Sequence, residues 1–106
     1  MGWQGKRVAV FCKHGNSRSV GAAYVLKKRG ADALSAGFFS ASPETKQMLV
    51  DWAELVIVME HKLLPHVPAT TKPVLLWDVG RDRFLSLHRE LLEMVTQFAD
   101  TYEREG

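Results

Sequence analysis

The chain has 106 residues, is 46% hydrophobic and 25% charged, and carries a net charge of +2. These values indicate one compact domain and exclude a disordered chain, and the scattered basic residues do not favour nucleic-acid binding. No apolar run approaches the roughly 20 residues of a membrane helix, and the start MGWQGKR has no apolar signal core. A single cysteine excludes an internal disulfide and fits a reducing compartment, so we expect a cytoplasmic protein.

The first half of the chain alternates predicted strands and helices. Residues 7–11 (RVAVF) are β-branched or aromatic and predict a buried strand. Residues 18–29 predict a helix, because apolar side chains recur at i, i+3 and i+4 before a glycine stop. Residues 33–38 (ALSAGF) predict a second strand, and a further helix is expected over residues 42–52, whose start Ser-Pro-Glu is typical of a helix N-terminus.

The second half continues the same alternation. Residues 55–59 (LVIVM) are apolar throughout, as in a strand covered on both faces, and a helical turn is expected at 61–66. Residues 73–77 (PVLLW) predict a fourth strand, and residues 78–84 are polar and irregular. The last helix is predicted by a stripe of 3.6-residue period, formed by Leu87, Leu91, Met94, Val95, Phe98 and Tyr102.

Strands that alternate with helices predict a parallel sheet with right-handed crossovers. Ligands of such sheets bind at the carboxyl ends of the strands. Cys12 ends the first predicted strand, and the segment 78–84 follows the fourth. We therefore expect these two segments to meet at one rim of the sheet.

The segment CKHGNSRS places the only cysteine between a strand and a helix. A loop that leads into a helix N-terminus points backbone N–H groups inward, which stabilises both a phosphate and a thiolate. Gly15 suits a loop position of positive φ, and the guanidinium of Arg18 can grip two phosphate oxygens at once. The hydroxyl of Ser19 can donate to the sulfur. The spacing Cys12-x5-Arg18-Ser19 thus predicts phosphate chemistry at a nucleophilic sulfur.

This segment resembles the signature of the low-molecular-weight protein tyrosine phosphatases, in particular the compact bacterial branch. The segments LSAGF, WAELVIVMEHKLLPHV and DVGRDRF extend the resemblance over most of the chain. It implies one phosphatase-like domain over residues 1–106. The expected fold is an α/β three-layer sandwich, in which a four-stranded parallel sheet of order 2-1-3-4 is covered by helices on both faces. The resemblance also implies hydrolysis of aryl phosphate monoesters, above all phosphotyrosine in proteins, through a phosphocysteine intermediate and without metal or cofactor. The expected partner is a phosphotyrosine protein or a small aryl phosphate, with no nucleic acid and no membrane.

The resemblance also assigns roles to residues. Cys12 is then the nucleophile, Arg18 the phosphate clamp and Asp82 the general acid, with Asp78 as the rival for that last role. The residues expected to bind substrate are the rest of the loop and two aromatic residues near the rim: Lys13, His14, Gly15, Asn16, Ser17, Ser19, Phe39 and Phe84. Phe38 and Trp77 fall near the same rim, with packing in the core as their alternative role.

The chain departs from the family pattern at several positions. The family has Gly-Asn two and three residues after the cysteine, whereas His14 and Gly15 stand there here, followed by Asn16. Ser17 replaces a frequent second cysteine, which removes a disulfide partner for oxidised Cys12. The segment before Asp82 carries one extra residue.

Two other functions remain open from the sequence. The phosphocysteine carriers of the phosphotransferase-system IIB type have a similar loop, C-x-x-G-x-S-x-S, which Cys12, Gly15, Ser17 and Ser19 match. Arg18 argues against a carrier, because a carrier has a small residue there. The second alternative is a catalytically weak phosphate-binding module. The related arsenate reductases need further cysteines, which this chain lacks, so we do not expect that activity without an external thiol.

Overall fold

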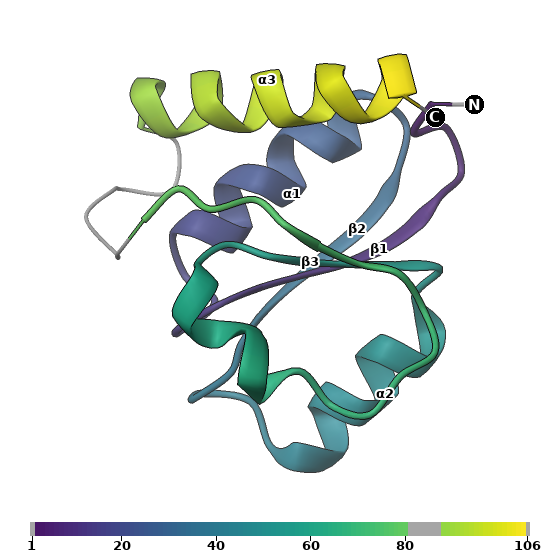
Figure 1. Ribbon diagram of the computed structural model, residues 1–106, viewed down its shortest axis with the longest axis vertical. Coiled ribbons are helices and arrows are strands. Elements are labelled where there is room, and N and C mark those ends of the chain that lie inside the picture. The colour runs from purple at the N-terminus through teal and green to yellow at the C-terminus, as the bar shows by residue number, and fades with distance from the viewer. Residues whose placement is uncertain (1, 81–87, 106) are drawn as a thin grey trace.

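A computed structural model describes residues 2–80 and 88–105 of the chain (Figure 1). The predicted alternation of strands and helices is confirmed, and most observed ends lie within one or two residues of the expected ones. The helical turn after the third strand is a 3₁₀ helix, η1. The elements in chain order are β1 (Arg7–Cys12), α1 (Arg18–Lys28), β2 (Asp32–Gly37), α2 (Pro43–Trp52), β3 (Leu55–Val58), η1 (His61–His66), β4 (Val74–Leu76) and α3 (Arg89–Glu105).

The four strands form one parallel sheet in the order β2-β1-β3-β4, which confirms the expected order 2-1-3-4. The register pairs Cys12 with Gly37 across β1 and β2, and Val58 with Leu76 across β3 and β4. All carboxyl ends therefore lie along the same edge of the sheet. In the sheet, β2 lies on one side of β1 and β3 lies on the other side. The order of the strands therefore reverses at β1, and its carboxyl end is the topological switch point.

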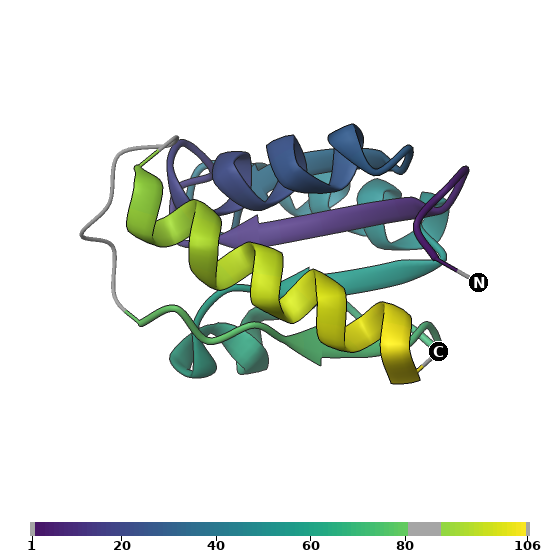
Figure 2. The same cartoon turned by 90° about the horizontal axis from the view of Figure 1, so that it is seen from above.

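Helices cover both faces of the sheet. Helices α1 and α3 pack on one face, and α2 packs with η1 on the other (Figures 1 and 2). The alternation of side chains along β1 explains this division: Val8, Val10 and Cys12 belong to the core under α1 and α3, while Ala9 and Phe11 belong to the core against α2. The same alternation places the sulfur of Cys12 on the side of α1.

The residues expected to begin α2 and to end α1 do so in the structure. The side chain of Ser42 accepts a hydrogen bond from the backbone N–H of Thr45 at 3.1 Å, and Pro43 opens α2. Gly30 follows α1 with φ of +94° and donates its N–H to the carbonyl of Lys27. Within residues 2–80 and 88–105, no helix combines the length and apolar character needed to cross a membrane.

The N-terminal segment adds a core residue that the sequence did not single out. Trp3 is only 1% exposed, and its indole N–H donates to the carbonyl of Ala99 at 3.3 Å. Its ring stacks on Tyr102 and meets Trp77 edge-on, with centroid distances of 4.4 and 5.8 Å. Trp77 in turn stacks on Phe98, so it packs in the core and is not available at the rim.

Candidate active site

The loop between β1 and α1 surrounds the sulfur of Cys12. Cys12 is the last residue of β1 and is buried. Its Sγ accepts the backbone N–H of Gly15 at 3.1 Å and lies 3.1 Å from the Oγ of Ser19. Ser19 belongs to the first turn of α1, so the sulfur lies at the N-terminus of that helix. Backbone N–H groups and the helix dipole favour negative charge at this place.

Two glycines allow the loop to lie directly on the end of β2. Gly15 has φ of +74°, and a Cβ there would come within 2.5 Å of the backbone nitrogen of Gly37 and 2.6 Å of the carbonyl carbon of Ala36. A Cβ on Gly37 would in turn overlap the carbonyl group of His14. The hydroxyl of Ser40 also donates to that carbonyl, at 2.8 Å. The sequence predicted the need for glycine at position 15; it did not predict the contact with Gly37.

Arg18 begins α1, and its side chain is fully buried. Its Nη1 lies 2.6 Å from Oε1 of Glu60 and donates to the carbonyl of Gly80, also at 2.6 Å. Glu60 follows β3 and Gly80 follows β4, so the guanidinium joins the ends of both strands to the loop. Sequence reasoning assigned no role to Glu60. The available signal was a carboxylate placed directly after a buried apolar strand.

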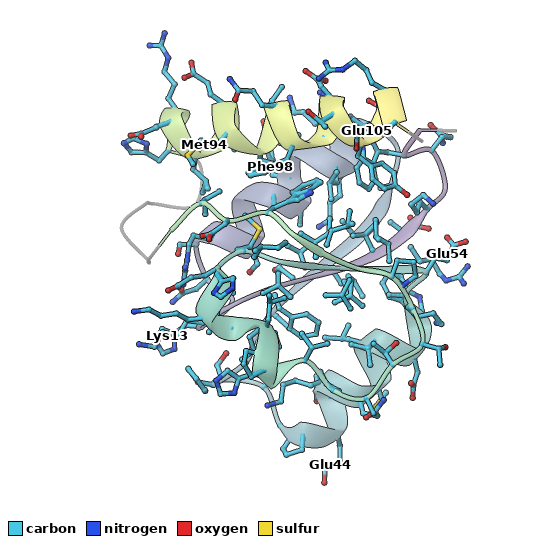
Figure 3. All side chains as sticks on the ribbon, viewed as in Figure 1. Lys13, Glu44, Glu54, Met94, Phe98 and Glu105 are labelled. Carbon is cyan, nitrogen blue, oxygen red and sulfur yellow. The ribbon has the colours of Figure 1, made fainter. Side chains whose placement is uncertain are left out.

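The exposed part of the loop lies at the same edge of the sheet. Lys13, His14 and Asn16 are at least partly exposed, whereas Ser17 is buried. Figure 3 shows Lys13 on the side of the molecule where η1 lies. The loop residues that the sequence nominated thus lie directly after Cys12, where Gly15 and Ser19 contact its sulfur, and their roles toward a substrate stay predictions.

The aromatic residues near the rim divide into two groups. Phe38 is 2% exposed and stacks on Phe11 with a centroid distance of 4.8 Å, so it belongs to the core. Phe39 is 53% exposed, and its backbone N–H donates to the carbonyl of Lys13 at 3.0 Å. His66 of η1 meets the Phe39 ring edge-on at 4.9 Å, a contact that the sequence did not predict. Phe39 therefore stands beside the loop with an accessible ring.

The segment after β4 is only partly described. Asp78 is exposed, and its Oδ1 accepts the backbone N–H of Gly80 at 3.0 Å, which ties a turn in place. Asp82 and Phe84, the expected acid and the second aromatic residue, lie outside the described residues. The assignment of the general acid therefore stays a prediction.

No protein-family model matches the sequence, and no curated protein matches it. Among solved structures, the tyrosine phosphatase Wzb from Escherichia coli K30, crystallised in complex with phosphate, is similar with a TM-score of 0.63 and 13% identity. That match covers 92% of this chain and 96% of the phosphatase. A thioredoxin-dependent arsenate reductase from Corynebacterium glutamicum is similar with a TM-score of 0.61 and 16% identity, over 97% of this chain and 64% of the reductase. The chain thus spans less than two thirds of the reductase, and its fold is that of the low-molecular-weight tyrosine phosphatases.

Proposed function

We propose that the chain is a cysteine-dependent phosphatase that hydrolyses aryl phosphate monoesters, with phosphotyrosine in proteins as the substrate class. One observation carries the proposal: the sulfur of Cys12 lies at a helix N-terminus, 3.1 Å from both the N–H of Gly15 and the hydroxyl of Ser19, in the loop that leads to the buried Arg18. A thiolate is the nucleophilic form of cysteine, and such surroundings stabilise it. The same N–H groups and guanidinium suit the oxygens of a phosphate.

In the first step of the proposed mechanism, the thiolate of Cys12 attacks phosphorus in line with the leaving oxygen. The P–S bond forms as the P–O bond to the aryl group breaks. Loop N–H groups and Arg18 hold the equatorial oxygens, where negative charge is spread in the transition state. The carboxylic acid of Asp82 gives its proton to the leaving phenolate oxygen.

In the second step, water attacks the phosphocysteine. The carboxylate of Asp82 takes a proton from the water as the P–S bond breaks, which releases inorganic phosphate and restores the Cys12 thiolate. The carboxylic acid is thereby regenerated for the next turnover. If Asp78 is the acid instead, the same two steps apply with the proton carried by that residue.

Arsenate reduction is the second candidate, and the similarity to the arsenate reductase favours it. Reduction of arsenate to arsenite takes two electrons. The chain holds one cysteine, so Cys12 can supply one of two thiols and an external thiol must supply the other to close the disulfide. Hydrolysis needs no second thiol, which is why we place the phosphatase first.

The test is incubation of the purified protein with phenyl phosphate and with a phosphotyrosine peptide while inorganic phosphate is measured. We expect many turnovers per chain without a partner protein. Cys12→Ser should abolish turnover, and Arg18→Lys should lose at least about tenfold because a point charge cannot replace the planar fork. Undiminished turnover in the Cys12→Ser variant would refute the assignment.

The same samples separate the alternatives. Mass spectrometry that finds one stable phosphoryl group per chain, without phosphate release, would identify a carrier. Formation of arsenite from arsenate only when an external thiol is added would identify a reductase. Phosphate binding with neither reaction would identify a binding module.

A further inference from the structure

Glu60 forms the most buried ion pair of the candidate site among the described residues. Its Oε1 is 2.6 Å from Nη1 of Arg18, and the side chains of Glu60 and Arg18 are 15% and 0% exposed. The same nitrogen donates to the carbonyl of Gly80 at 2.6 Å. Two acceptors, one after β3 and one after β4, thus hold a single corner of the guanidinium.

A guanidinium is planar and rigid, so fixing one nitrogen also fixes the direction of the opposite edge. That edge carries the N–H groups that can grip two oxygens of a phosphate at once. Arg18 lies at the point where the phosphate loop enters α1, only six residues after the nucleophile. The direction of its fork therefore decides how well it meets the equatorial oxygens.

We propose that Glu60 is a positioning residue that aims Arg18 at the phosphate, with the carbonyl of Gly80 holding the same nitrogen of Arg18 from the end of β4. This inference rests on the proposed function, because it assigns Arg18 to the phosphate.

A second physical effect of Glu60 opposes the first. Its negative charge offsets the positive potential that Arg18 presents to an incoming dianion, so the charge alone would weaken phosphate binding. Two conservative variants separate position from charge. Glu60→Gln keeps the length of the side chain and an acceptor oxygen but removes the charge. Glu60→Asp keeps the charge, but its side chain is shorter by one methylene, so the carboxylate lies farther from Arg18.

The experiment compares kcat/KM for phenyl phosphate and the inhibition constant of inorganic phosphate in these two variants. Positioning predicts that Glu60→Gln stays within about threefold of the unchanged protein, while Glu60→Asp loses about 10- to 100-fold in kcat/KM and binds phosphate more weakly, as misplacement by about 1 Å can cost that much. If Glu60→Asp stays within about threefold of the unchanged protein in kcat/KM, the positioning role is wrong, and tighter phosphate binding by Glu60→Gln would then show that the charge decides.

Glu54 provides a matched control at the other end of the same strand. It directly precedes β3, accepts the backbone N–H of Arg7 at 2.9 Å, and lies on the side of the molecule opposite Lys13 (Figure 3). Glu54→Gln and Glu54→Asp should leave kcat/KM and the inhibition constant unchanged. Thermal unfolding of all four variants shows how far each is destabilised, and destabilisation alone would lower the folded fraction without changing the inhibition constant.

A readout that does not depend on hydrolysis keeps the two proposals distinguishable. Cys12 is the single cysteine, so its alkylation by iodoacetamide can be followed without ambiguity, and bound inorganic phosphate should protect it. If the protein proves unable to hydrolyse aryl phosphates, a half-protecting phosphate concentration about tenfold higher in Glu60→Asp than in the unchanged protein would still support the positioning role. Equal protection in Glu60→Asp and in the unchanged protein would overturn that role alone. Failure of phosphate to protect the unchanged protein would overturn both proposals.

Discussion

Replacing Gly15 with alanine tests whether the loop geometry carries the chemistry. The backbone at Gly15 has φ of +74°, which costs an alanine about 1–2 kcal/mol. The new Cβ would also lie 2.5 Å from the nitrogen of Gly37, where ordinary contact begins at 3.4 Å. The obstacle is backbone of β2, so the loop must move by about 1 Å, enough to break the 3.1 Å hydrogen bond from the Gly15 N–H to the sulfur of Cys12. We expect kcat/KM for phenyl phosphate to fall by about 10²-fold.

Gly5 is the matched control because it has the same φ of +74°, and a Cβ added there would meet no heavy atom of the described residues within 4 Å. Gly5→Ala should therefore show the backbone cost alone, a loss of about 1–2 kcal/mol in urea unfolding with unchanged kcat/KM. Gly15→Ala should be destabilised by more than Gly5→Ala and should also lose activity. If Gly15→Ala keeps kcat/KM within about threefold of the unchanged protein, the loop does not hold the reacting sulfur as we describe.

Three further predictions concern the core, the surface and the acid. Trp3→Ala should lower the free energy of unfolding by about 3–5 kcal/mol in urea titration, since the ring is 1% exposed and its N–H bonds to Ala99; a loss below about 1 kcal/mol would contradict its place in the core. The hydrogen bond from the backbone N–H of Arg7 lowers the pKa of Glu54, so the ionised carboxylate stabilises the fold. This stabilisation is complete above the pKa of an unfolded glutamate, about 4.3, and is lost as the pH falls through the pKa of Glu54 in the folded state. Glu54→Ala should therefore have a lower Tm than the unchanged protein at pH 7, and the difference in Tm should shrink toward pH 3. Asp82→Asn should slow phenyl phosphate hydrolysis by about 10²–10⁴-fold and p-nitrophenyl phosphate distinctly less, and equal slowing of both would remove Asp82 from the role of acid.

The fold could be predicted from local patterns in the sequence. The apolar run of β3 and the capping residues Ser42 and Pro43 of α2 each specify one element without knowledge of its neighbours. Alternation of strands and helices then predicts a parallel sheet. The strand order came from the resemblance of CKHGNSRS and the later segments to a known family, and TM-scores of 0.63 and 0.61 to two enzymes of this fold support it.

The contacts that sequence reasoning missed all join residues far apart in the chain. Trp3 reaches Ala99, and Arg18 reaches Glu60 and Gly80, through pairings that no local period reveals. The sequence places both Phe38 and Phe39 near the rim and nominates Phe39 to bind substrate. In the structure Phe38 directly follows β2 and packs in the same core cluster as Ala36, whereas Phe39 is exposed, and a shift of one residue in this segment would reverse that result.

The candidate site is assembled from the carboxyl ends of all four strands. β1 ends in the sulfur of Cys12, and β2 ends in Gly37, on which the loop lies. β3 is followed by Glu60 and β4 by Gly80, and both hold Arg18. Cys12 ends β1, which lies between β2 and β3 in the sheet, and so it stands at the topological switch point, where open parallel sheets bind ligands. Because a glycine, a backbone carbonyl and a paired carboxylate fix the geometry, variants such as Gly15→Ala and Glu60→Asp should lower kcat/KM by about 10- to 100-fold although neither residue reacts, whereas loss of the reacting sulfur in Cys12→Ser should abolish turnover.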